Sequence, residues 1–424
     1  MSWLRQSAAI AASIALLLNA TGAAAQPAFR PANLKPNISS AEAGIWGASD
    51  KAEAAIRSSA DLNRDVQLTA YVKGVLCRIA PEYCSEIRVY VLDRPFLNAG
   101  AWPNGAVEVN SGLLLRARTE DELSFVLGHE VTHFARNHSL RQHENEKATR
   151  NAMLALQIGV TLGAAAAMYS AASTGSPYAS STIDSISRSA QSLNNLIYLA
   201  GVASLFAYSR ESESEADEFG FKRYHAAGYQ AAAAPSIWHY VEDENAASDF
   251  DAVRRSQARA SIYMTHPITG QRIAALSAMA GTDAKKDPSR EEQLRYRAAI
   301  RPHLAAWLKD DLRRRDFGQT LFLLDRLSEP GEDLGVINFY RGEAFRLRRK
   351  DGDVEKAVAA YRVSVSYADA PPASYRELGE ALRKIGDKPS AQEAFRTYLQ
   401  KVPDAQDRWL IEASLKSLET GGLK

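Results

Sequence analysis

The stretch that decides the fold is HEVTH, residues 129–133 of a 424-residue chain. On a helix, His129 and His133 lie one turn apart on the same face, and Glu130 stands beside them. Neutral imidazole nitrogens bind zinc, and a neighbouring carboxylate can reach a water at the open position of the metal. The motif therefore predicts a zinc hydrolase with His129 and His133 as metal ligands and Glu130 as the catalytic base.

The residues around the motif favour a helix. Leu123, Val126 and Val131 recur at helical spacing. Upstream, Thr119 followed three residues later by Glu122 forms a capping box that would begin this helix. A catalytic zinc normally takes three protein ligands plus water, so one more donor must come from elsewhere in the chain.

An acidic helical segment, SRESESEAD at residues 209–217, is the best source of the third ligand. Glu213 and Asp217 are four residues apart and share one helix face, so one can bind zinc while the other orients a ligand histidine. Glu211 and Glu215 point to other faces. Taken by itself, such a run is more often a solvated helix surface.

Further motifs accompany these two segments. They are Asn98-Ala99, Gly105, Gly112-Leu113-Leu114, Ser209-Arg210 with Glu213, Ala216-Asp217 and Ala227-Gly228-Tyr229. In order and spacing, together with HEVTH, they resemble the HtpX and CaaX-prenyl-protease type of zinc metallopeptidase over residues 40–275. The resemblance implies one zinc ion per chain with Glu213 as its third ligand, and leaves Asp217 to support a ligand histidine from behind.

The first 25 residues have the pattern of a secretory signal peptide. Arg5 precedes an apolar stretch at residues 8–18, and the small residues Ala23, Ala24 and Ala25 precede Gln26. The apolar stretch is too short to span a bilayer. We expect cleavage before Gln26 and a periplasmic location, peripheral to the outer membrane at most. Because no cysteine stands at the cleavage site, a lipoprotein anchor is not expected.

The two cysteines of the chain, Cys77 and Cys84, are close in sequence. In an exported protein oxidation is permitted, so a disulfide that closes a small loop is expected. The alternative is two ordinary reduced, buried cysteines.

A small β-sheet is predicted before the zinc helix. Residues 65–79 have a helical pattern, and residues 87–92 and 105–110 have strand patterns. An edge strand beside the metal can bind an extended substrate by main-chain pairing. The candidate edge strand consists of Ala106, Val107, Glu108, Val109 and Asn110. The alternative is that this strand lies in the interior of the sheet.

Residues 152–207 are predicted to form an apolar helical hairpin with a Ser-rich loop. Residues 153–172 and 193–206 are apolar and rich in Ala, and the Ser-rich segment at 173–192 lies between them. Relatives in the membrane use such segments as spans. Because both segments have few strongly apolar residues, a hairpin packed on the domain or touching a membrane surface is favoured over a true span. The loop is a candidate lid.

A Thr-His-Pro element at residues 265–267 is followed by Arg272, which is also similar to the family. His266 and Arg272 are candidates for a fourth zinc position or for a hydrogen bond to the oxyanion formed during hydrolysis. The alternative for His266 is a structural histidine before proline. The other histidines have no partner at ligand spacing, so His138 and His143, for example, are expected to be surface or structural groups.

The C-terminal part has only helical patterns. Ala357, Ala360 and Tyr361 recur 34 residues later as Ala391, Ala394 and Phe395. A period of 34 with small and aromatic residues indicates tetratricopeptide repeats, whose concave surface usually binds a protein. The alternative is a plain helical bundle. With this tail, the chain resembles the BepA-like periplasmic proteases that assist β-barrel assembly, which implies the β-barrel assembly machinery as a candidate partner of the repeats.

Composition argues against nucleic-acid binding, because 51 lysines and arginines against 50 aspartates and glutamates leave a net charge of +1. The predicted fold class is α+β, with a mostly helical zincin-type metallopeptidase domain at residues 26–285 and a helical repeat domain at residues 286–424. The predicted function is an exported zinc endopeptidase that hydrolyses misfolded or unassembled envelope proteins, chiefly of the outer membrane. The alternative is a chaperone or assembly scaffold for outer-membrane proteins whose zinc site is latent and capped by its own chain.

Overall fold

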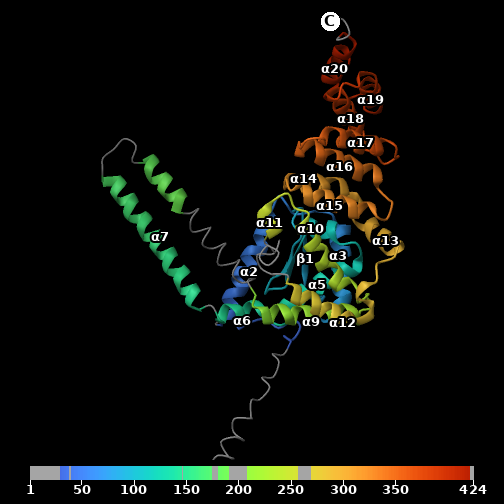
Figure 1. Ribbon diagram of the computed structural model, residues 1–424. Helices are drawn as coiled ribbons and strands as arrows, with labels where there is room; N and C mark the ends of the chain where they lie inside the picture. Colours follow the sequence, from blue (N-terminus) through green and yellow to red (C-terminus); the bar gives the residue numbers. More distant parts are fainter. Residues whose placement is uncertain are drawn as a thin grey trace, which may run out of the picture.

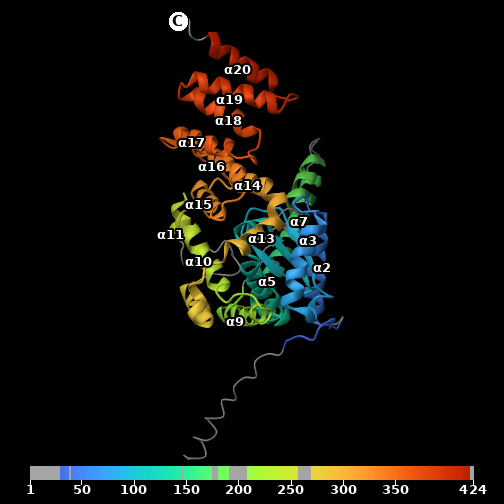
Figure 2. The same cartoon turned by 90° about the vertical axis from the view of Figure 1, so that its right-hand side faces the viewer.

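The computed structural model describes residues 29–37, 40–145, 147–173, 180–190, 208–255 and 269–420. It confirms the α+β class: helices surround one small sheet, and a stack of helices follows (Figures 1 and 2). The predicted signal peptide, His266 and the apolar segment at 193–206 lie outside the described residues.

Up to residue 255, the described chain has a helical stretch at residues 180–190 and ten further helical segments that accompany the sheet. In chain order they are α2 (Ala41–Ser58), α3 (Val66–Ile79), η1 (Pro81–Tyr83), α4 (Ser111–Arg116), α5 (Glu120–Ala135), α6 (His138–Asn145), α7 (Lys147–Ser173), α9 (Arg210–Ala226), α10 (Ala233–Ala246) and α11 (Asp251–Arg255). The segments that follow are α12 (Gly270–Ala280), η2 (Gly281–Lys285), α13 (Arg290–Ile300), η3 (Arg301–His303), α14 (Leu304–Arg313), α15 (Phe317–Ser328), α16 (Leu334–Arg348), α17 (Asp353–Val365), α18 (Ala373–Lys384), α19 (Lys388–Lys401) and α20 (Arg408–Thr420).

The sheet has three strands, β1 (Arg88–Leu92), β2 (Ala99–Ala101) and β3 (Ala106–Asn110), in the order β1-β3-β2. β1 runs parallel to β3, and β2 runs antiparallel to it. The prediction that residues 106–110 form an edge strand is therefore wrong, because β3 has a neighbour on each side. Four of its five residues are buried, as expected for a strand covered on both faces.

Helices α5 and α9 cross where each carries a glycine. A Cβ atom built on Gly220 would lie 2.8 Å from the backbone nitrogen of His129, and one built on Gly128 would lie 3.1 Å from the carbonyl oxygen of Gly220. Only residues without a side chain allow this approach. The two glycines therefore set the distance between the HEVTH helix and the acidic helix.

We expect Gly220→Ala to lower the free energy of unfolding by about 1–3 kcal/mol, because α9 must move away from α5 to admit the methyl group. Gly74→Ala in α3 is the matched control. Nothing lies within 4 Å of a Cβ built on Gly74, so alanine there should stabilise the protein by about 0.5–1 kcal/mol. Urea unfolding of the two variants measures both effects. A Gly220→Ala protein as stable as its parent would show that the crossing tolerates a wider spacing.

The predicted disulfide is present. Cys77 in α3 and Cys84 just after η1 are bonded, with their Cα atoms 4.8 Å apart. The bond ties the end of α3 to the segment that leads into β1, and so holds the start of the sheet against the helix that covers it.

Helix α7 projects away from the sheet (Figure 1). Leu162 and Tyr169 on it are 65% and 79% exposed. Within the described ranges, none of the helices combines the length and apolarity of a membrane span. The prediction of a Ser-rich loop is wrong for residues 180–190, which are helical. In that segment Ile183 and Ile186 lie three residues apart, which gives the helix one apolar stripe.

Beyond α13 the helices pack on their sequence neighbours and form the stack seen in Figures 1 and 2. A Cβ atom on Gly342 would clash with the ring of Tyr361, and one on Gly379 with the ring of Phe395. These are contacts of small against aromatic residues, as the periodicity predicts. The buried hydrophobic core continues from α3 to α20 without a break.

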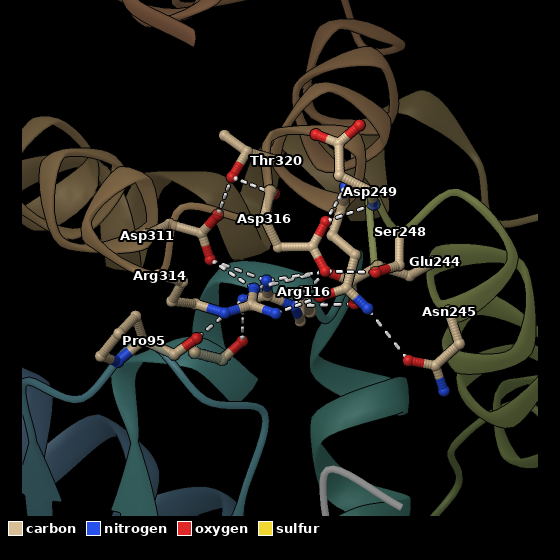
Figure 3. Close-up of polar contacts among 12 residues, drawn as sticks. Pro95, Arg116, Glu244, Asn245, Ser248, Asp249, Asp311, Arg314, Asp316 and Thr320 are labelled. Carbon is tan, nitrogen blue, oxygen red and sulfur yellow. Dashed lines mark hydrogen bonds and ion pairs between the residues drawn. The ribbon is translucent and has the colours of Figure 1, made fainter. Parts of the chain in front are cut away.

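A buried arginine joins the sheet-containing part to the stack (Figure 3). Arg116, at the end of α4, donates through Nε to Glu244 of α10 at 2.8 Å and through Nη2 to Asp311 of α14 at 2.7 Å. All three side chains are fully buried. Asp311 also accepts hydrogen bonds from Thr320 at 2.7 Å and from Arg314 at 3.0 Å. The network satisfies the buried charges at the junction and fixes how α14 lies against α4.

Candidate metal centre

Helix α5 begins at the predicted cap. The Thr119 hydroxyl accepts a hydrogen bond from the backbone N–H of Glu122 at 3.3 Å. The Glu122 carboxylate accepts from the backbone N–H of Arg118 at 2.7 Å, one residue before the cap, so only half of the predicted capping box forms. The helix is buried over residues 122–135, which places HEVTH in the interior.

The structure brings the three predicted metal ligands together. His129 Nε2 and His133 Nε2 are 3.0 Å apart. The Glu213 carboxylate from α9 lies 3.5 Å from His129 Nε2 and 3.6 Å from His133 Nε2. One ligand atom from each residue lies within 4.8 Å of the others, and all three residues are buried. Two helices distant in sequence thus supply one compact donor set.

The donors fit a zinc ion. Two imidazole nitrogens and one carboxylate oxygen form the set that a catalytic zinc takes from protein in one common class of hydrolase, with the fourth position left for water. Glu130 is 3% exposed and follows His129 directly on α5. A carboxylate therefore stands beside the donor set without being part of it.

Asp217 supports His129 from behind, as the sequence predicts. Its Oδ1 lies 3.0 Å from His129 Nδ1, the ring nitrogen that faces away from Glu213. Burial lowers the pKa of His129, but the hydrogen bonds with Asp217 and Glu213 outweigh it and raise that pKa to about 9. The carboxylates therefore make this pocket favourable for positive charge.

Arg272 is not a fourth ligand, and that prediction is corrected, whereas its role as an oxyanion donor stays a prediction. Its Nε and Nη2 donate to Asp217 at 2.6 and 2.7 Å, and its Nη1 lies 2.7 Å from Glu213 Oε2. A guanidinium has no lone pair for a metal, and three of its nitrogens are used by carboxylates. Burial raises the pKa of Asp217, but Arg272 outweighs it, so the pKa stays below its usual range. Arg272 therefore keeps Asp217 ionised and holds both carboxylates in place.

Two residues that contact the His133 ring were not predicted to belong to the site. His138 is fully buried, and its Nδ1 lies 2.8 Å from His133 Nδ1. Tyr208 stacks on the His133 ring, with centroids 3.8 Å apart and planes 15° from parallel. The sequence signal for the position of His138 is Asn137, which comes shortly after the end of α5. Its φ of 51° changes the direction of the chain there. Asparagine tolerates this left-handed conformation better than most residues.

Glu215 points away from the three donors, as expected, and binds His138 Nε2 at 2.9 Å. Its carboxylate also accepts hydrogen bonds from Arg136 at 3.2 Å and Arg141 at 2.7 Å. Burial raises the pKa of Glu215, but these three partners lower it to about 2. Burial also lowers the pKa of His138 to about 4. A neutral imidazole and then a carboxylate therefore lie on the Nδ1 side of His133, the second histidine of the motif.

Comparison with known proteins agrees with this geometry. A protein of Vibrio cholerae, named putative beta-barrel assembly-enhancing protease, is 26% identical over 253 residues, which cover 59% of this chain and 45% of that protein. The beta-barrel assembly-enhancing protease of Escherichia coli K12 is 24% identical over 225 residues, or 52% of this chain and 40% of that protein. The matched part thus spans less than half the length of these relatives.

A shorter match is to the mitochondrial metalloendopeptidase OMA1 of Bos taurus, which is 41% identical over 61 residues, or 14% of this chain and 11% of that protein. Residues 63–280, just over half of the chain, match Peptidase family M48. This range contains the three donors, Glu130, Asp217 and Arg272. The chain belongs to peptidase family M48.

Proposed function

We propose that this protein is an exported zinc endopeptidase that hydrolyses misfolded or unassembled envelope proteins. The observation that carries the proposal is the buried group of His129, His133 and Glu213 with Glu130 beside it. A structural zinc is usually closed by four protein ligands and needs no base, whereas the described part of the chain supplies three donors and an adjacent carboxylate.

A bound zinc ion would polarise the scissile carbonyl and lower the pKa of a water toward about 7. In the proposed mechanism, Glu130 accepts a proton from the water as its oxygen attacks the carbonyl carbon. Glu130 then gives that proton to the amide nitrogen as the C–N bond breaks, which regenerates its carboxylate. Asp217 and Arg272 hold His129 and Glu213 in position throughout.

Substrate binding by strand pairing is assigned to β2 in place of β3. β2 is an outer strand of the sheet and packs beside α5, which carries the motif. An extended peptide that pairs with an outer strand is recognised through its main chain, so sequence selectivity is low. This suits a protease that acts on unfolded segments of different proteins.

The compartment and partners are proposed from two observations. The disulfide between Cys77 and Cys84 suits an oxidising compartment such as the periplasm. The relatives are named for β-barrel assembly, so we propose outer-membrane proteins as substrates. We further propose that residues 26–285 form the peptidase domain, and that residues 286–424 are tetratricopeptide-like repeats that recruit substrate or the β-barrel assembly machinery.

Metal removal tests the proposal. We expect a zinc chelator to lower cleavage of an unfolded outer-membrane protein at least about 100-fold, because the metal supplies several kcal/mol of transition-state stabilisation. One equivalent of zinc should restore the rate, and protein dialysed without chelator is the control. Full cleavage by metal-free protein would refute the proposal. Support of barrel assembly with no cleavage in either form would favour the chaperone alternative.

A further inference from the structure

The second histidine of the motif is backed by a chain of two hydrogen bonds. His133 turns Nε2 toward His129 and Glu213, and turns Nδ1 toward His138 Nδ1 at 2.8 Å. On its far side, His138 Nε2 lies 2.9 Å from Glu215 Oε2. None of the motifs that define the site in the sequence includes His138 or Glu215 as a functional residue.

The donors and acceptors available determine which group donates in each of these two hydrogen bonds. Glu215 accepts from Arg136 and Arg141, so its carboxylate acts as an acceptor toward His138 as well. His138 therefore carries its proton on Nε2 and presents a lone pair at Nδ1. That lone pair accepts from the Nδ1–H of His133, which leaves the lone pair of His133 on Nε2, the nitrogen that faces the other two donors.

Glu215, the last residue in this series of hydrogen bonds, is on the same helix as the third donor. Glu213 and Glu215 are both on α9, and Glu215 is held by Arg136, the residue that directly follows α5. A shift of α9 along α5 would therefore disturb the donor Glu213 and the support of His133 together. His129 has the corresponding support in Asp217, through a carboxylate bound directly to its Nδ1.

We propose that His138 and Glu215 are positioning residues that fix the tautomer and ring orientation of His133, and thereby set the zinc affinity of the site. The inference rests on the proposed zinc peptidase function, and it adds a carboxylate–histidine–histidine relay to the carboxylate–histidine pair at His129. Partners of this kind typically contribute 10–100-fold to metal affinity.

The test compares His138→Leu with His138→Asn. Leucine has a similar size and no acceptor, whereas the Asn oxygen stands close to where Nδ1 of histidine lies. We expect His138→Leu to weaken zinc binding about 10–100-fold in competition with a chelator of known affinity, and His138→Asn to retain most of the affinity. His303→Leu is the control, because it removes a histidine–carboxylate hydrogen bond of 2.9 Å, to Asp65, away from the three donors.

Absorption of the cobalt(II)-substituted protein gives a second readout, since its visible bands report ligand geometry. His138→Leu should shift these bands, and His138→Asn and His303→Leu should not. Parental zinc affinity and an unchanged cobalt spectrum in His138→Leu would overturn the inference. If His138→Leu does not fold, Glu215→Gln decides in the same way, because weakened zinc binding supports the relay and parental binding refutes it. A parent protein that binds no zinc would instead refute the proposed function.

Discussion

Replacing Glu130 with glutamine should lower kcat by at least about 10²–10⁴-fold while one zinc ion stays bound. Glutamine has nearly the same shape as glutamate, so the packing of the buried end of α5 is retained. Its amide cannot accept a proton from the attacking water. The donors His129, His133 and Glu213 are unchanged, so metal content and activity should separate in this variant.

The measurement is cleavage of an unfolded outer-membrane protein, with zinc content determined on the same samples. Glu211→Gln is the matched control, because Glu211 is an exposed carboxylate on α9, two residues before Glu213. It should cleave at the parental rate. If Glu130→Gln cleaves at the parental rate with zinc bound, Glu130 is not the base and the mechanism is wrong.

The second large effect is expected at the junction. Arg116→Met should lower the free energy of unfolding by about 3–5 kcal/mol, because it leaves Glu244 and Asp311 as buried charges without their main partner. Both carboxylates are fully buried. Arg314 and Thr320 remain as partners of Asp311 and offset only part of this cost. Protonation of the carboxylates or separation of α10 and α14 would relieve the rest.

Urea unfolding measures this loss, and Arg313→Met is the control. The Arg313 side chain is 69% exposed and pairs only with Asp310 among the described ion pairs, so its removal should change the free energy of unfolding by about 0.5 kcal/mol at most. Adding Glu244→Gln and Asp311→Asn to Arg116→Met should recover part of the stability, since the two buried anions are then removed. A loss below about 1 kcal/mol in Arg116→Met would show that the junction does not depend on this network.

Much of the fold follows from local patterns. The segments predicted at residues 65–79, 87–92 and 105–110 appear as α3, β1 and β3 with ends within one residue. β2 was missed because Ala-Gly-Ala has no strand propensity of its own and is a strand only through pairing with β3. The helix at 180–190 was missed because its serines resemble those of a loop.

The same division holds in the site. HEVTH and the spacing of Glu213 from Asp217 define faces of single helices, so periodicity predicted the two histidines and limited the third donor to one of two carboxylates. The family resemblance then selected Glu213. Arg272 could be identified as a candidate but not given a role, because its partners on α9 are 55 or more residues away in sequence. His138 follows a break in the helix at Asn137, where helical periodicity no longer says which way a side chain points.

The sequence by itself determined the chemistry: two imidazoles one helix turn apart with a carboxylate beside them, a second, acidic helix, and a pair of cysteines close enough to bond. Each is a short-range property, since a helix or a small loop has one geometry wherever it occurs. Tertiary structure alone decided which strand is outermost, that glycines bring α5 and α9 together, and that Arg116 is buried between α4, α10 and α14. These depend on packing between segments far apart in the chain, where burial and charge pairing select one arrangement from many that local patterns allow.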